Sequence, residues 1–231
     1  MLRFSLFMLL VLALTTSCAE SYHIVGSTAI EGGRHVQLRQ RMPAVAIAQA
    51  NIIHGRFELE GIFDSVAIVD LYVDGQHIIP IVIERELCSI HIAPTEQQVT
   101  GGLLNTKLSN FIKKKRHLYH RIAVLREKLN TLEIQGLYDT PDYHSYTYDI
   151  NRLLRQLQDL QVTFVVKNQT NILGPYYFAS ILSSHCDLHD NQMPLLRQIL
   201  RKTSPHFRNL PAVAQVIVSN PELRLIPSQQ P

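Results

Sequence analysis

The sequence contains no tryptophan and only three cysteines, and its net charge is only +3. The absence of tryptophan disfavours a carbohydrate-stacking site. No two cysteines form a Cys-x-x-Cys pair, which excludes dithiol redox chemistry within the chain. The small net charge gives no indication of a nucleic-acid ligand. The chain also lacks a Gly-x-Ser-x-Gly elbow, a phosphate loop and a His-Glu-x-x-His motif, so we expect neither an enzyme nor a resident cofactor.

Long apolar runs are equally scarce, and the one present lies at the N-terminus. Residues 4–14 are apolar except for Ser5, a run too short to span a bilayer but typical of a secretory signal. Small residues follow at 15–17 and lead directly to Cys18, as in a bacterial lipoprotein signal. We therefore predict a signal peptide over residues 1–17 and a lipid-anchored envelope protein, on the periplasmic side, attached through the Cys18 thiol. Plain secretion and an uncleaved anchor are the alternatives.

Residues 18–101 show the pattern of β-strands. Val36 and Leu38 alternate with polar residues, and "RFELEGIF" places Phe57 and Leu59 on one side. Asp74-Gly75 is a strong hairpin signal between two further apolar runs. Short, evenly spaced strands with turn residues between them predict an antiparallel β-sandwich or an open barrel.

Residues 102–220 change to a three- and four-residue apolar spacing. The pattern predicts one long helix over 104–132, ended by Gly136, and a second over about 146–166. Three shorter helices follow, the middle one capped by Asp190 or Asn191, and residues 221–231 are expected to be a flexible tail. The predicted fold class is α+β, with the β-domain first and an α-helical bundle after it.

The remaining cysteines, Cys88 and Cys186, are far apart in sequence. An exported protein can keep a disulfide, so they form either a bridge or two separately packed thiols. Cys186 also stands between His185 and His189 in "SSHCDLHD", and these three residues are weak candidates for metal ligands. Histidines at a helix end also cap free carbonyl groups, and on that interpretation no metal binds.

Two further segments have both a functional and a purely structural interpretation. "FIKKKRHLYHRIAVLREK" is either a patch for anionic lipid or polyanion, or a solvated helix face. "YDTPDYHSYTYD" is either a partner-binding loop or a connection whose tyrosines lean on neighbouring helices, with Asp142 or Ser145 as the next cap. Its candidate contact residues are Tyr138, Tyr143, Tyr146 and Tyr148.

Several motifs occur together in a characteristic order. Tyr-x-Ile-x-Gly is met by residues 22–26, Gly-x-Phe-x-Phe-x-Gly by residues 55–61 with Leu59 in the second aromatic place, and Val-x-Gly-x-x-x-Asn by residues 99–105. In this order they resemble the N-terminal module, domain-of-unknown-function family 4369, of Bacteroidetes envelope thiol–disulfide oxidoreductases. The resemblance covers roughly residues 22–220. Two departures are Cys88 in place of a turn glycine and Gly102 in place of a frequent threonine.

In that family a thioredoxin-like domain follows the module, whereas this chain ends near the position of the linker. The resemblance therefore implies a stand-alone accessory module without the redox residues. It leaves two hypotheses for function: a non-catalytic binding or scaffolding module, or an accessory partner of a separate thioredoxin-like protein.

Overall fold

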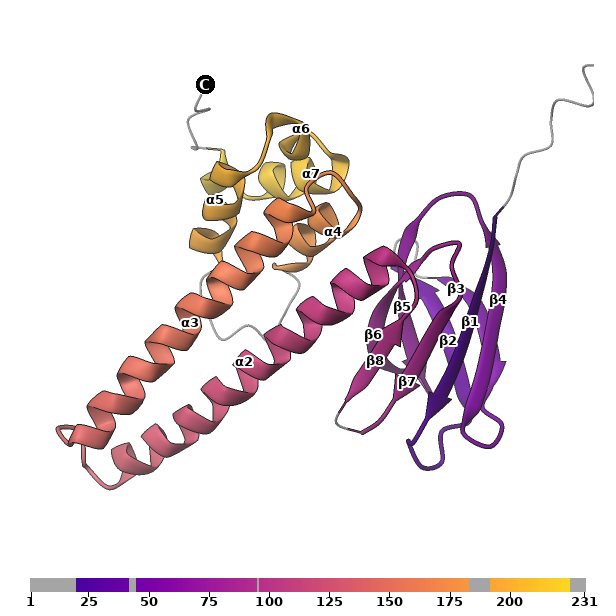
Figure 1. Cartoon of the computed structure of the whole chain (residues 1–231). Helices are drawn as coiled ribbons and strands as arrows, with labels where there is room; N and C mark the ends of the chain where they lie inside the picture. Colours follow the sequence, from indigo (N-terminus) through magenta and orange to yellow (C-terminus); the bar gives the residue numbers. More distant parts are fainter. Residues whose placement is uncertain (1–19, 42–44, 95, 183–191, 225–231) are drawn as a thin grey trace, which may run out of the picture. The chain divides into compact units, whose positions relative to one another are not determined.

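The computed structural model describes residues 20–41, 45–94, 96–182 and 192–224 of the chain (Figure 1). It divides into two compact units, residues 1–102 and residues 103–231, which we call the β-unit and the helical unit. The first contains the strands and the second the helices, which confirms the predicted α+β class.

The β-unit is an open sandwich of two four-stranded sheets. One sheet has the strand order β4-β1-β7-β8 and the other β3-β2-β5-β6. The strands are β1 (Glu20–Thr28), β2 (His35–Gln40), β3 (Val45–Asn51), β4 (Arg56–Phe63), β5 (Ala67–Val73), β6 (Gln76–Ile83), β7 (Cys88–Ile92) and β8 (Gln97–Thr100). Of the two architectures that the alternation allowed, the sandwich is the one formed.

One strand pair departs from the antiparallel expectation. β1 and β7 run parallel, with Ile24 opposite Cys88, whereas the other strand pairs are antiparallel. Parallel neighbours need a long crossover connection. Here the chain builds the whole second sheet, β2, β3, β5 and β6, between β1 and β7, and this excursion brings β7 back in the parallel direction.

Glycines and aromatic rings face each other across β1 and β4. Tyr22 is paired with Gly61 and Gly26 with Phe57, and both rings are buried in the sandwich core. A Cβ atom placed on Gly26 would lie 2.0 Å from the Phe57 ring, and one on Gly61 would lie 2.5 Å from the Tyr22 hydroxyl. Each ring thus fills the space that the opposite glycine leaves, which explains the spacing of both strand motifs.

The predicted turn at Asp74-Gly75 forms as expected. Asp74 and Gly75 have φ angles of 47° and 82° and join β5 to β6. His54 and Gly55 also have positive φ, and their turn carries the chain from β3 in one sheet to β4 in the other. Two consecutive residues with positive φ make the type I′ geometry that suits twisted strands.

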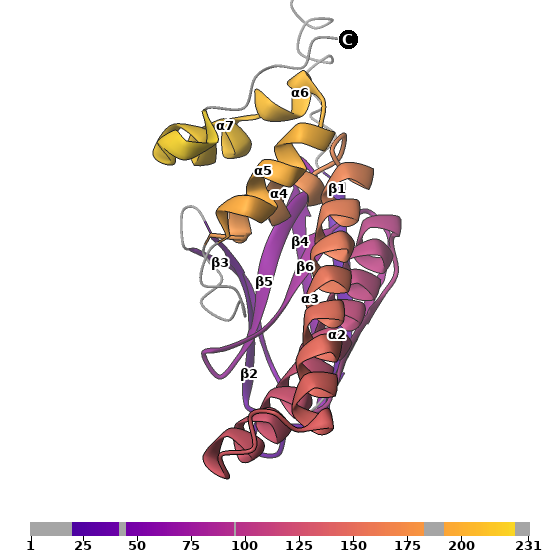
Figure 2. The same ribbon diagram turned by 90° about the vertical axis from the view of Figure 1, so that its left-hand side faces the viewer.

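The helical unit is built on a long antiparallel helix pair (Figure 2). Its elements are α2 (Leu103–Ile134), α3 (Pro141–Lys167), α4 (Leu173–Ser180), α5 (Met193–Lys202), α6 (Pro205–Arg208), α7 (Pro211–Ser219) and the 3-10 helix η1 (Pro221–Leu223). Ile122 from α2 packs with Ile150, Leu153 and Leu157 from α3 in a buried cluster. Gly136, with φ of 72°, ends α2 at the predicted residue.

α3 begins earlier than the sequence pattern predicted. Thr140, and neither Asp142 nor Ser145, is its N-cap, and its hydroxyl accepts a hydrogen bond from the Tyr143 amide. Pro141 occupies the first helical position, where its missing N–H removes no bond. The prediction of a tyrosine-rich loop over residues 138–149 is therefore wrong after Thr140, because the chain is helical from Pro141.

The C-terminal part differs at two further points. α5 follows Gln192 as its N-cap, which corrects the expected Asp190 or Asn191. The segment predicted to be a flexible tail begins with the 3-10 helix η1, in which Leu223 is 2% exposed. Burial of this leucine explains why residues 221–223 are ordered although the segment is rich in proline. Residues 225–231 lie outside the described part of the chain.

The glycine–aromatic pairs give the first testable prediction. Gly26→Ala should lower the free energy of unfolding of the β-unit by about 1–3 kcal/mol, because the new methyl group overlaps the Phe57 ring. Hydrogen exchange of the β1 and β4 amides measures this loss. Gly33→Ala is the matched control, since the nearest atoms to its Cβ are at 3.4 Å. Equal effects of the two changes would contradict the packing argument.

Candidate functional site

Several predicted site residues lie outside the described part of the chain. These are the lipid-attachment residue Cys18 and the weak metal candidates His185, Cys186 and His189. No helix among the described residues is long and apolar enough to cross a membrane.

The four candidate tyrosines do not form one surface loop. Tyr143 and Tyr146 are half-buried on α3: the Tyr143 hydroxyl donates to Glu133 at 3.3 Å, and Lys128 Nζ lies 5.6 Å from the centre of the Tyr146 ring. Tyr138 packs edge-on against Tyr143, with 5.9 Å between ring centres. Tyr138 and Tyr148 are the exposed members, at 56% and 64%. Tyr143 and Tyr146 thus lean on α2, as the structural interpretation proposed.

Cys88 carries a free thiol inside the sandwich and is 3% exposed. Burial, with a smaller contribution from Glu84, raises the pKa of the Cys88 thiol to about 12. Such a thiol is protonated at neutral pH and is a poor nucleophile. Cys88 therefore packs as a small apolar residue, which was the alternative to a disulfide bridge.

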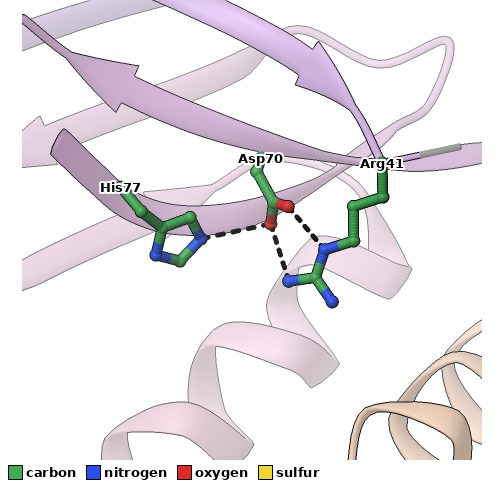
Figure 3. A network of polar contacts seen from close by, with 3 residues as sticks. All are labelled: Arg41, Asp70 and His77. Carbon is green, nitrogen blue, oxygen red and sulfur yellow. Dashed lines mark hydrogen bonds and ion pairs between the residues drawn. The ribbon is translucent and has the colours of Figure 1, made fainter. Parts of the chain in front are cut away.

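A buried carboxylate on the other sheet was not found from the sequence. Asp70, in the middle of β5, is 3% exposed and accepts hydrogen bonds from Arg41 and His77 (Figure 3). The distances are 2.5 Å from Arg41 Nε to Oδ2, 3.0 Å from Arg41 Nη2 to Oδ1, and 3.1 Å from His77 Nε2 to Oδ1. We call these three residues the Asp70 network.

The Asp70 network keeps the carboxylate charged. Burial by itself raises the pKa of Asp70, but the hydrogen bonds from His77 and Arg41, with the charge of Arg41, outweigh it and leave the pKa below its ordinary value. A carboxylate that orients a histidine occurs in many catalytic sites. Here, however, the bidentate guanidinium of Arg41 takes up both oxygens, so the arrangement is that of a structural ion pair that joins the residue after β2 to β5 and β6.

A second polar cluster lies on adjacent strands of the first sheet. His23 on β1 contacts the carboxylate of Glu58 and lies 3.6 Å from that of Glu60, both on β4. One ligand atom from each lies within 4.8 Å of the others, a geometry that could hold a divalent cation. All three side chains are 43–68% exposed, and a cross-strand ion pair explains the same arrangement.

An open groove runs between α2 and α3 within the helical unit. It consists of two hollows, of about 490 Å³ and about 550 Å³, that share Asn110, Lys114 and Leu160. Phe111 and Phe164 line the first and Leu118 the second. The basic residues along the groove are Lys107, Lys113, Lys114, His117 and Lys167. We call this surface the lysine groove.

The electrostatics of α2 are one-sided around this groove. No aspartate or glutamate occurs between Leu103 and Arg126, whereas seven lysines and arginines do. The first turn of α2 lacks an acidic residue that would complement the helix dipole. The helix is therefore basic and lacks acidic residues from Leu103 to Arg126.

Comparison with known proteins gives no relatives. No protein-family model, no curated protein and no solved structure matches this chain.

The sequence indicates some of these sites and not others. It shows the basic segment of α2, but it does not show which residues of α3 complete the lysine groove. Asp70 could have been suspected, since it is a lone charge within the apolar strand "AIVDLYV". Its partners Arg41 and His77 became apparent only from the strand register.

The Asp70 network gives a pH-dependent prediction. Asp70→Asn should lower the free energy of unfolding by about 1–3 kcal/mol at pH 7, because Arg41 and His77 lose a charged acceptor. A lowered folded-state pKa gives stability that is present above the ordinary carboxyl pKa and is lost as the pH falls through the folded value. The difference between wild type and variant should therefore shrink towards pH 3. Urea unfolding at both pH values measures it.

Asp64→Asn is the control for this experiment, because Asp64 is exposed. An Asp70→Asn effect that stays constant between pH 7 and pH 3 would contradict the assignment of the stabilisation to a charged carboxylate.

Proposed function

We propose that this chain is a non-catalytic binding module, held at a bacterial envelope membrane by a lipid on Cys18. The lipid anchor rests on the N-terminal pattern of a short apolar run, small residues at 15–17 and a following cysteine. The binding role rests on the lysine groove, an open apolar surface with a one-sided basic rim.

The lysine groove is the observation that carries the binding role. Apolar side chains that line an open hollow, as these do within the described part of the chain, are typical of surfaces that bind a ligand or partner. A basic rim restricts the ligand to one with negative charge. The Asp70 network, in contrast, pairs its carboxylate with Arg41 and His77.

The second candidate is an accessory partner of a separate thioredoxin-like protein. The ordered motifs at residues 22–26, 55–61 and 99–105, which resemble the N-terminal module of envelope oxidoreductases, favour it. Cys88 does not supply the chemistry for such a role, because its thiol is buried and its pKa is raised. On this hypothesis the module acts by docking, without thiol exchange through Cys88.

The lipid anchor predicts a specific modification. Mass spectrometry of the native protein should find Cys18 as an acylated N-terminal residue, and Cys18→Ala should abolish incorporation of labelled fatty acid and leave the leader uncleaved. Cys88→Ala is the matched control and should leave both unchanged. An unacylated mature N-terminus would contradict the proposal.

The buried thiol predicts resistance to alkylation. In the folded protein at pH 8, peptide-resolved mass spectrometry should show that Cys88 reacts with iodoacetamide at least about a hundredfold more slowly than in urea, because the thiol is both shielded and protonated. Rapid reaction of Cys88 in the folded state would instead favour a redox role for this residue.

A further inference from the structure

We propose that the lysine groove binds an anionic phospholipid, with an acyl chain on its apolar floor and the headgroup phosphate held by lysines. This inference rests on the binding role proposed above and names the ligand class. It does not depend on the lipid attached to Cys18.

The two hollows of the groove differ in chemistry. Lys107, Lys114 and Lys167 all line the first hollow, together with the polar side chains of Asn110 and Thr163. Lysines act as compact point charges suited to phosphate. Because these three lysines line one hollow and one of them comes from α3, we assign the phosphate to this hollow.

The floor of the groove supplies the complementary apolar surface. Leu160 is half-buried, lines both hollows and thus makes the floor continuous from one to the other. Leu118 extends the floor in the second hollow. The groove follows α2 from Lys107 to His117, which is roughly 15 Å at the rise of an α-helix. That length accommodates a large part of an acyl chain.

The floor is also rigid, because an aromatic cluster supports it. Phe111 stacks on Phe164 with 3.9 Å between ring centres, and Tyr177 of α4 packs edge-on against both. The Tyr177 hydroxyl accepts hydrogen bonds from Lys115 at 3.1 Å and Gln161 at 2.9 Å. The groove is therefore preformed, which limits the entropy lost on binding.

Charge complementarity selects the ligand. An anion in the first hollow would be attracted by the three lysines that line it, Lys107, Lys114 and Lys167. A neutral lipid would fill the floor but gain no attraction from these lysines. A polyanion without an acyl chain would do the reverse. An anionic phospholipid satisfies both parts of the groove.

The test uses the chain without residues 1–18, so that neither an attached lipid nor the apolar run at residues 4–14 contributes to vesicle binding. Vesicles of phosphatidylcholine with about one-third phosphatidylglycerol are compared with pure phosphatidylcholine vesicles by flotation. We expect phosphatidylglycerol-dependent binding that weakens with salt. Lys114→Glu and Lys107→Glu should each weaken it about tenfold.

Arg155→Glu is the matched control. Arg155 is an exposed cation on α3 that does not line the groove, and its reversal changes the net charge by the same amount. It should change binding by less than about twofold. Equal losses in all three variants would show a diffuse charge effect and overturn the proposal, as would binding that is independent of phosphatidylglycerol.

A soluble arm tests the acyl chain. Lysophosphatidylglycerol below its micelle concentration should bind, and Leu160→Gln should weaken this binding several-fold while leaving heparin binding unchanged. Circular dichroism checks that each variant is folded, and the exposed Lys107→Glu remains informative if Leu160→Gln is not. Binding of heparin but not of lysophosphatidylglycerol would overturn the acyl-chain site. A groove that binds only acidic helical peptides would overturn it too.

These outcomes are separable from failure of the lipid anchor. An unacylated Cys18 in native protein would refute the anchor but leave the groove measurements valid, because these are made on a chain without the attached lipid.

Discussion

Close packing of two glycine–aromatic pairs sets the geometry of the β-unit. Tyr22 lies over Gly61 and Phe57 over Gly26, on directly opposed positions of β1 and β4. A slip of one residue would turn both rings out of the core, because side chains alternate between the faces of a sheet. β1 is the strand that also pairs with β7, so its register fixes the position of the first sheet as a whole.

The sequence allowed the classes and many limits of the elements to be predicted, because these depend on local chemistry. Three local signals were sufficient to predict a strand, a turn and a helix end. They are the alternation at Val36 and Leu38, the turn residues Asp74-Gly75, and Gly136 after a long apolar stripe. The parallel pairing of β1 with β7 was not accessible, since it depends on where the chain returns after residues 29–87. The start of α3 was missed because its first turns are rich in tyrosine, aspartate and serine, which have low intrinsic helix propensity. Packing of Tyr143 and Tyr146 on α2 overrides that preference.

The candidate sites were predictable only in part, and for the same reason. The basic segment of α2 is local, so its charge was apparent from the sequence. The lysine groove also requires Leu160, Phe164 and Lys167 from α3, which come into place through antiparallel helix packing. Asp70 likewise acquires Arg41 and His77 through the register of three strands. Interactions between elements were thus the part that a single sequence did not reveal.

The two units differ in how their charged side chains are paired, and the proposed function rests on this difference. In the β-unit the buried Asp70 is paired with Arg41 and His77. In the helical unit the residues that line the lysine groove include four lysines and neither an aspartate nor a glutamate. A proposed lipid tether adds a further physical consequence. A membrane-anchored module experiences headgroups at an effective concentration in the millimolar range, so a groove of modest intrinsic affinity would be occupied without a deep, closed pocket. An open basic groove is therefore sufficient for a tethered module to bind lipid.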